Sequence, residues 1–293
     1  MRTPAENDAA ADGGLASLRQ DGPDAATQAV AGGAANEAPG AAKVRVRIRF
    51  TKMGKIRWTS HRDVARMWER AFRRVQLPLA YSEGFSPRPK VSFGLALPTG
   101  HESVAEYLDV ELCDHRDVDV PALPERLSGA LPVGVEATAA EVIVPGTPSL
   151  QEDVTACTWR WVAVPAEGSE PVGCDEMAVR VASVFAATSA VITRTRKGSE
   201  QTDDIRSGIL NLQSLGPAGP DHMHGICLEA DLACRPLSVR PSEVLLALGP
   251  DLEERSVRRT HQWILREGAR REPLVVASPD VATDAPHAWE RAS

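Results

Sequence analysis

The sequence predicts an α+β protein built from two ferredoxin-like sandwiches in tandem, each with the element order β-α-β-β-α-β and the second copy divergent. Three observations predict this class. The chain has 293 residues, enough for two domains. Short segments alternate apolar and polar residues, as strands do, and apolar stripes at helical spacing separate them. The second half of the chain repeats this order of elements without repeating the residues.

The first predicted domain covers residues 43–148 and opens with a strand at 43–52 (KVRVRIRFTK). Val, Ile and Phe alternate there with arginine, so one face of the strand should be buried and the other face should lack a helix cover. Ser60 then caps a helix that ends near Gln76, before Pro78. The remaining elements are strands at 90–98, 103–112 and 133–144 and a short helix that starts at Pro121.

The second predicted domain covers 153–250. Its elements are strands at 154–164, 190–198 (continued through 204–215) and 224–234, and helices at 174–187 and 241–249. Residues 251–293 are predicted to form a C-terminal extension that is partly helical over 256–268 and disordered from about Ser278. Residues 1–42 are rich in Ala, Gly, Asp and Pro, cannot bury enough apolar surface to offset their ordering entropy, and are predicted to be a disordered tail.

Several classes of protein are disfavoured by the composition. The sequence has no run of eighteen apolar residues and no basic segment followed by an apolar one at its start, so we expect a cytoplasmic protein without a membrane span. Its five cysteines are scattered, without a CxxC pair or zinc-ligand spacing, so we expect reduced thiols and neither a metal nor a cofactor. No phosphate-binding loop or hydrolase motif is present.

Charge is distributed unevenly along the chain, whose net charge is −7. Residues 43–100 carry fourteen Lys or Arg and three Asp or Glu, a balance of +11, whereas residues 1–42 balance to −4 and residues 101–293 to −14. A strongly basic segment within an acidic protein is typical of a surface that binds a polyanion. A solvated basic face is the alternative.

The helix predicted from Ser60 concentrates these charges. Arg62, Arg66, Arg70 and Arg73 recur at steps of four, four and three, so they should form an exposed ridge about 16 Å long. The residues predicted to contact nucleic acid are Arg45, Arg47, Arg49, Lys52, Lys55, Arg57, His61, Arg62, Arg66, Arg70, Arg73, Arg88, Lys90, Arg194, Arg196 and Lys197.

The loop YSEGFSPRPK (81–90) follows this helix. Gly84 permits a turn, and Pro87 and Pro89 fix the backbone on both sides of Arg88. Tyr81 and Phe85 are expected to anchor the loop to the core. The loop should then be a rigid edge of the binding surface, and a stiff connector with incidental charge is the alternative.

Two other functions stay open. His61 lies beside the arginine ridge at the start of the helix, so it is a candidate acid or base for a metal-independent endoribonuclease, although a structural histidine is the commoner case. The basic face could also meet an acidic protein, which would make the chain a protein-interaction domain without a role in RNA binding.

The segment 50–112 resembles a family of bacterial radical-SAM-linked proteins, a domain of unknown function, and we expect the stand-alone form of that domain. The motifs that carry the resemblance are GKIRW, SHRD, ER-x-x-RR, LPLAYSEGF-x-PRPK and SFG, and it continues weakly over roughly 43–250. The resemblance implies a radical-SAM enzyme as partner. The chain lacks a CxxxCxxC loop, so it is not itself the iron–sulfur catalyst. Together these observations predict a non-catalytic module that binds tRNA or rRNA for a radical-SAM enzyme.

Overall fold

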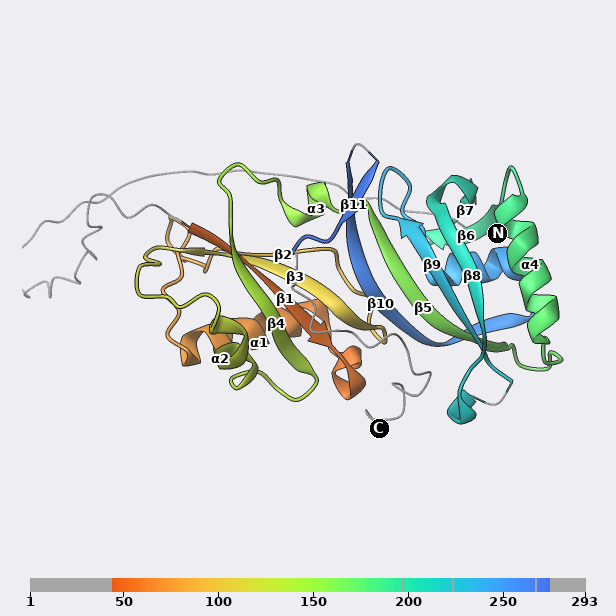
Figure 1. Cartoon of the computed structure of the whole chain (residues 1–293), viewed down its shortest axis with the longest axis horizontal. Helices are drawn as coiled ribbons and strands as arrows, with labels where there is room; N and C mark the ends of the chain where they lie inside the picture. Colours follow the sequence, from red (N-terminus) through yellow and green to blue (C-terminus); the bar gives the residue numbers. More distant parts are fainter. Residues whose placement is uncertain (1–43, 197, 223, 267, 275–293) are drawn as a thin grey trace, which may run out of the picture. The chain divides into compact units, whose positions relative to one another are not determined.

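One large mixed sheet runs through both halves of the chain (Figure 1). The computed structural model describes residues 44–196, 198–222, 224–266 and 268–274, so the predicted tails at 1–42 and from Ser278 lie outside the described residues. Its strands follow the order β4-β1-β3-β10-β5-β9-β8, with β2 beside β3 and β11 beside β10, and a separate hairpin contains β6 and β7. The α+β class is confirmed, with few helices.

The elements of the first half are β1 (Val44–Lys52), the 3-10 helix η1 (Gly54–Trp58), α1 (His61–Arg74), β2 (Val91–Phe93), β3 (Glu102–Leu112), α2 (Leu123–Ser128), β4 (Val135–Ile143) and α3 (Leu150–Asp153). Those of the second half are β5 (Ala156–Pro165), α4 (Cys174–Ala186), β6 (Val191–Arg196), β7 (Ser199–Asp204), η2 (Arg206–Gly208), β8 (Ile209–Pro217), η3 (Pro220–His222), β9 (Ile226–Ala233), α5 (Pro241–Leu248), β10 (Leu252–Arg266) and β11 (Ala269–Arg271).

Strand order is the same in the two halves. Four strands of the first half lie in the order β4-β1-β3-β2, and four strands of the second half lie in the order β10-β5-β9-β8, with every neighbouring pair antiparallel. The halves join where β10 pairs in parallel with β3, Arg258 opposite Glu102 and Arg259 opposite Ser103. One continuous sheet therefore spans the two halves of the chain.

Two predicted elements are wrong. The segment 256–268 was expected to be partly helical, but it belongs to the strand β10, which lies in the middle of the sheet between β3 and β5. The segment 190–198 with its continuation was expected to be one strand, but it is the hairpin β6–β7 followed by the separate strand β8. The first error comes from charged residues whose partners lie far away in the sequence, whereas the second overlooked a local hairpin.

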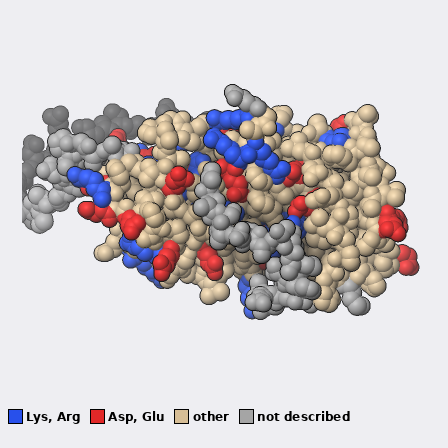
Figure 2. Space-filling view, viewed as in Figure 1, with Lys and Arg blue, Asp and Glu red and all other residues tan. Residues whose placement is uncertain are grey.

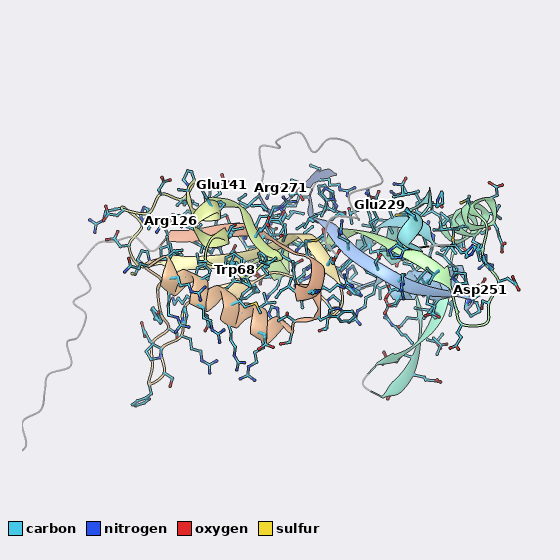
Figure 3. All side chains as sticks on the ribbon, turned by 90° about the horizontal axis from the view of Figure 1, so that it is seen from below. Trp68, Arg126, Glu141, Glu229, Asp251 and Arg271 are labelled. Carbon is cyan, nitrogen blue, oxygen red and sulfur yellow. The ribbon has the colours of Figure 1, made fainter. Side chains whose placement is uncertain are left out.

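The core of the first half lies between α1 and the sheet. Ser60 caps the helix by accepting a hydrogen bond from the backbone N–H of Asp63, as predicted. The buried stripe of α1 includes Trp68, whose ring meets that of Phe50 on β1 edge to face at 4.9 Å. Figure 3 shows Trp68 directed from α1 toward the strands. This packing fixes which side of α1 remains in solvent.

The opposite face of β1 and β3 was predicted to lack a helix cover, with the second half of the chain or a partner packing there as the alternative, and the structure shows it covered by α3 and by residues near Leu274. Tyr107 on β3 is 1% exposed and packs with Leu150 of α3 and with Leu274. Arg47 on β1 is also 1% exposed, and one of its nitrogens donates to the carbonyl of Pro273 at 3.4 Å. Residues from the C-terminal end of the described chain therefore occupy the surface that was expected to bind RNA.

Candidate nucleic-acid interface

The arginine ridge of α1 is exposed along its length. Arg62, Arg66, Arg70 and Arg73 all project into solvent, and in Figure 3 the side chains of α1 extend away from the sheet. Arg66 pairs with Asp63 at 3.2 Å, and Arg73 donates to the carbonyl of Glu69. Within the described ranges, neither Arg62 nor Arg70 has a hydrogen bond or a carboxylate at ion-pair distance. The ridge therefore keeps a strong positive charge.

Two further arginines lie at the C-terminal end of α1. Arg74 donates to the carbonyl of Ala130 at 2.9 Å, and Arg126 of α2 donates to the carbonyl of Val75 at 2.8 Å. Both acceptors are neutral, so they hold the guanidinium groups in place without neutralising them. Arg126 was not among the residues predicted to bind nucleic acid, because it lies in a region of acidic average charge.

Exposed aromatic side chains flank the ridge. Trp58 is 65% exposed and immediately precedes α1. A Cβ on Gly100 would come within 2.9 Å of its ring, so glycine is needed there for the ring to rest against the backbone. The guanidinium carbon of Arg57 lies 5.5 Å from the ring centroid. This cation and ring are therefore presented together at the start of α1.

The loop at 81–89 is held by its own backbone and not by its aromatic residues. Phe85 is fully exposed and Tyr81 is 52% exposed, so the prediction that they anchor the loop to the core is wrong. The backbone N–H of Ser82 instead donates to the carbonyl of Arg88 at 2.9 Å, and the N–H of Arg88 donates to the hydroxyl of Ser82 at 3.0 Å. Gly84 makes the turn with φ of 118°.

This arrangement leaves Phe85 and Arg88 projecting from a closed loop. In Figure 3 the loop extends from the end of α1 to the same side of the sheet as the α1 side chains. We use the name α1 surface for a set of exposed residues from η1, α1 and the 81–89 loop; they are Lys55, Trp58, Arg62, Arg66, Arg70, Arg73, Arg74, Phe85 and Arg88.

The three arginines of β1 do not belong to this surface. Arg47 forms a buried double hydrogen bond with Asp109, at 2.7 and 2.9 Å, and so cannot reach an external phosphate. Arg45 donates to the carbonyl of Thr147, and its side chain is 28% exposed. Arg49 lies 4.0 Å from Glu272 and is 17% exposed. They help hold the covering segments against β1 and β3.

Lys52 and Arg194 are also structural. The Lys52 amine is buried and donates to the carbonyls of Arg57 and Thr59, at 3.2 and 2.9 Å, and burial lowers its pKa. Arg194 is 8% exposed and bonds Asp203 at 2.8 Å and Glu243 at 2.5 Å. These two residues were predicted to bind nucleic acid, but their burial rules out contact with a phosphate on the surface.

The remaining residues that were predicted to bind nucleic acid differ in whether their charge is free to contact a phosphate. Lys55 and Arg88 are exposed, and no described residue forms an ion pair with either. Arg57 pairs with Glu102 at 3.3 Å and Lys90 with Glu111 at 3.0 Å, so their charges are partly compensated. Lys197 and the side chain of Arg196 lie outside the described part of the chain.

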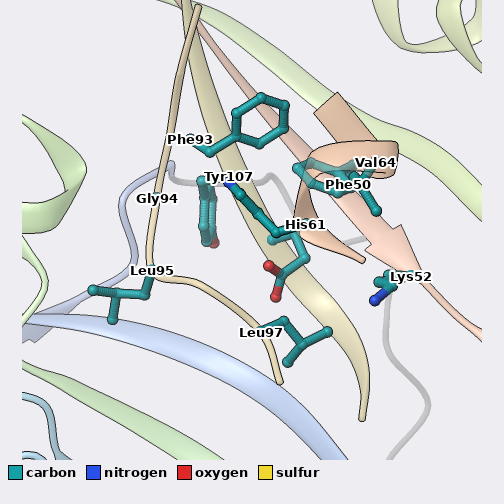
Figure 4. Close-up of a pocket in the computed structure, with 10 residues that line it drawn as sticks. Phe50, Lys52, His61, Val64, Phe93, Gly94, Leu95, Leu97 and Tyr107 are labelled. Carbon is teal, nitrogen blue, oxygen red and sulfur yellow. The ribbon is translucent and has the colours of Figure 1, made fainter. Parts of the chain in front are cut away.

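His61 lines a small pocket beneath the start of α1 (Figure 4). The pocket has a volume of about 20 Å³, enough for one water molecule. Its other polar groups, the Lys52 amine and the Glu106 carboxylate, already have structural partners. The His61 ring meets the Phe93 ring edge to face at 5.1 Å, and no described side chain hydrogen-bonds to it. Its role as an acid or base stays a prediction.

A second basic patch lies away from the α1 surface. Figure 2 shows Lys and Arg side chains gathered over β11 and the end of β10. Arg266 pairs with Asp153, and Arg270 bonds Asp231 at 2.9 Å while its guanidinium carbon lies 3.7 Å from the centroid of the Trp263 ring. These acidic partners compensate much of the charge, in contrast to the arginines of α1.

No helix among the described residues is long and apolar enough to cross a membrane. In the same residues, His, Cys, Asp and Glu side chains do not gather in a group of three or more that could hold a metal ion.

Comparison with known proteins gives one assignment. No curated protein matches the chain by sequence. Among solved structures, the archaeal box H/ACA sRNP Nop10–Cbf5 complex aligns with 13% identity and a TM-score of 0.38, over 74% of this chain and 47% of that one. A Cbf5–Nop10–Gar1 complex aligns with 13% identity and a TM-score of 0.39, over 74% and 48%. The chain thus spans about half the length of these neighbours, and TM-scores this low assign neither a fold nor a function.

The family comparison is stronger. Residues 45–239, two thirds of the chain, match the model of one bacterial family. That match includes α1, the 81–89 loop and every strand as far as β9. The chain therefore belongs to the family described as "Uncharacterized protein conserved in bacteria (DUF2344)".

Proposed function

We propose that this protein is an RNA-binding module and that RNA lies along the α1 surface. The observation that carries the proposal is the uncompensated positive charge of the α1 ridge, where Arg62 and Arg70 meet no described carboxylate at ion-pair distance. Arginine side chains can form paired hydrogen bonds with phosphate oxygens. A ridge of about 16 Å is long enough to contact several successive phosphates.

The exposed aromatic rings indicate which form of RNA fits best. Trp58 and Phe85 offer ring faces beside the cations, and unpaired bases stack on such rings. Bases within a duplex are already stacked and cannot do so. Single-stranded segments, such as the loops of a structured tRNA or rRNA, are therefore the proposed ligand.

The test measures RNA affinity against salt concentration. The probe is a fluorescently labelled single-stranded RNA of about 16 nucleotides, titrated with the full chain. If the ridge contacts phosphates, log K should fall linearly with log salt, with a slope of roughly −0.7 per contact. Arg62→Glu combined with Arg70→Glu should weaken binding and make the slope shallower.

The matched control is Arg271→Glu, which makes the same change of charge at an exposed arginine of β11. This variant should retain the affinity and the salt slope of the parent protein. Absence of binding at low salt would refute the proposal. An equal loss of affinity in the control would show that only the overall charge matters.

The partner is proposed from the resemblance of the 50–112 segment to radical-SAM-linked proteins. On that basis the module would present RNA to a radical-SAM enzyme for modification or maturation. An acidic protein could also occupy the α1 surface. Capture of partners from nuclease-treated lysate by the parent protein and by the Arg62→Glu, Arg70→Glu variant distinguishes the two: a protein retained without RNA, and lost only in the variant, favours a protein interface.

We also interpret the two halves as divergent copies of one βαββαβ unit. The shared strand order supports this. In each half, the strands lie side by side in the spatial order fourth, first, third, second, counted along the chain. The second copy would then carry the β6–β7 hairpin as an insertion after its first helix.

A further inference from the structure

Two cysteine sulfurs lie close together in the second half. Cys157 on β5 and Cys234, the residue after β9, have their Sγ atoms 3.5 Å apart. The backbone brings them together, because the N–H of Cys234 donates to the carbonyl of Thr155 at 2.8 Å. Cys157 is 0% exposed, whereas Cys234 is half-buried. Sulfurs in a disulfide lie about 2.05 Å apart, so the remaining gap is roughly 1.5 Å.

The surroundings give the two thiols different reactivity. The hydrogen bond from Cys157 lowers the pKa of Cys234 below its ordinary value, and the nearby Arg259 and Arg235 act in the same direction. Burial raises the pKa of Cys157. The more accessible thiol is therefore also the one that ionises more readily, which is the arrangement of a reactive cysteine beside a resolving one.

We propose that Cys157 and Cys234 form a reversible disulfide when the protein meets a peroxide. The short sulfur–sulfur distance, the partial exposure of Cys234 and the burial of Cys157 carry this proposal, which is independent of RNA binding. The pair lies in the protein interior next to Arg259, which also connects β10 with β3. Metal binding does not explain the pair, since the described residues offer it no third ligand.

The chemistry proceeds in two balanced steps. The Cys234 thiolate attacks one peroxide oxygen, the O–O bond breaks, and the sulfur is oxidised to a sulfenic acid as hydroxide leaves from hydrogen peroxide. The Cys157 sulfur then attacks the sulfenic sulfur, the S–S bond forms and the S–O bond breaks. The departing hydroxide takes the proton of Cys157 and leaves as water. A dithiol reductant reverses the reaction and restores both thiols.

Peptide mapping of the full chain tests the proposal. The protein is exposed to graded hydrogen peroxide, its remaining thiols are alkylated in denaturant, and linked peptides are identified by mass spectrometry. The expected product is a peptide pair joined through Cys157 and Cys234 that dithiothreitol releases. The oxidised protein should also melt several degrees higher, because the link closes a long loop of the unfolded chain.

Variants make the test specific. In Cys234→Ala, the Cys157 thiol should stay open to alkylation after peroxide treatment. The control, Cys113→Ser with Cys174→Ser, removes two exposed thiols and should leave the link intact. The proposal is wrong if Cys157 remains reduced in the parent protein while the exposed cysteines oxidise. Recovery of Cys234 only as a sulfinic acid, or linked to another cysteine, would overturn it as well.

Discussion

Arg259 and Glu106 form a buried ion pair that joins the two halves of the chain. Arg259 Nη2 lies 2.6 Å from one carboxylate oxygen of Glu106 and 2.8 Å from the other, and the two side chains are 2% and 10% exposed. The same nitrogen donates to the carbonyl of Leu95 at 2.8 Å. The pair sits where β10 meets β3, so it secures the only strand pairing that connects the halves in the described sheet.

We expect Glu106→Gln to lower the free energy of unfolding by about 3–5 kcal/mol, because it leaves the buried charge of Arg259 uncompensated. Urea unfolding followed by circular dichroism measures the change. Replacing both partners, with Glu106→Leu and Arg259→Met, should recover much of the stability, since no unpaired charge then remains. A single variant as stable as the parent protein would show that Leu95 and the other neighbours satisfy Arg259 without Glu106.

The exposed aromatic residues should contribute to RNA affinity and not to stability. Trp58→Ala and Phe85→Ala should each weaken binding of single-stranded RNA by about 1–3 kcal/mol if a base stacks on the ring. Fluorescence anisotropy measures the affinity, and thermal melting checks that the fold is unchanged. Val133→Ala, which removes another fully exposed apolar side chain, is the control and should have no effect. If all three variants bound RNA with equal affinity, bases would not stack on Trp58 or Phe85.

Arg70 and Arg194 were both predicted to bind nucleic acid, but the structure separates them. Arg70→Ala should reduce RNA affinity and leave the unfolding free energy within about 0.5 kcal/mol of the parent, as at an exposed site. Arg194→Ala should leave RNA affinity unchanged and cost about 3 kcal/mol of stability, because Glu243 loses its buried partner. Paired measurements of affinity and urea stability on both variants check this. The opposite pattern would place the binding surface on the β6–β7 hairpin.

His101 and Glu254 should make the free energy of unfolding change with pH in opposite directions. Their Nε2 and Oε2 atoms lie 4.0 Å apart, and the side chains are 17% and 22% exposed. Burial raises the pKa of Glu254 from 4.5 to about 7. Burial, together with Arg259, Arg240 and Lys52, lowers the pKa of His101 from 6.5 to about 4. Each group therefore binds protons differently in the folded and unfolded states.

Between pH 4.5 and 7 the folded protein holds a proton on Glu254 that the unfolded chain has released, so this residue makes stability fall as pH rises. Between pH 4 and 6.5 the unfolded chain holds a proton on His101 that the folded protein lacks, so this residue makes stability rise. In Glu254→Gln only His101 contributes, so the free energy of unfolding should rise with pH by up to about 3 kcal/mol. In His101→Gln only Glu254 contributes, so the free energy of unfolding should fall as pH rises. Urea unfolding across this pH range measures both. If the unfolding free energy of both variants changed with pH in the same direction, the roles given to His101 and Glu254 would be wrong.

The sequence alone predicts the local structure well where one face is buried against neighbours that are close in the chain. The alternation of 43–52 located β1, and the stripe containing Trp68 located the buried side of α1 and its exposed arginines. The same alternation placed Arg47 on the second face of β1, but it could not show that residues near Pro273 cover that face. The segments that cover this face lie far from β1 in the chain, and the residue pattern of a strand does not show which distant segments will pack on it.

Other errors have the same origin. The segment 256–268 was predicted to be partly helical, but its Arg258 and Arg259 find their partners in Glu102 and Glu106, more than 150 positions earlier. Phe85 was expected to be buried because most phenylalanines are. The amino-acid composition of the loop does not predict the hydrogen bonds between Ser82 and Arg88 that close it. Because these bonds hold the loop, the Phe85 ring stays exposed to solvent.

The position of β10 in the sheet constrains the order in which the protein can mature. The strand that lies between β3 and β5 ends at Arg266, so a ribosome must make every residue as far as Arg266 before the sheet can close. Until then, β3 and β5 each lack a neighbour and expose backbone groups that could pair with other chains. Closure also requires contacts of very high sequence separation, which form slowly. We therefore expect nascent chains that stop before β10 to depend on chaperones, and chains that include β10 to become independent of them.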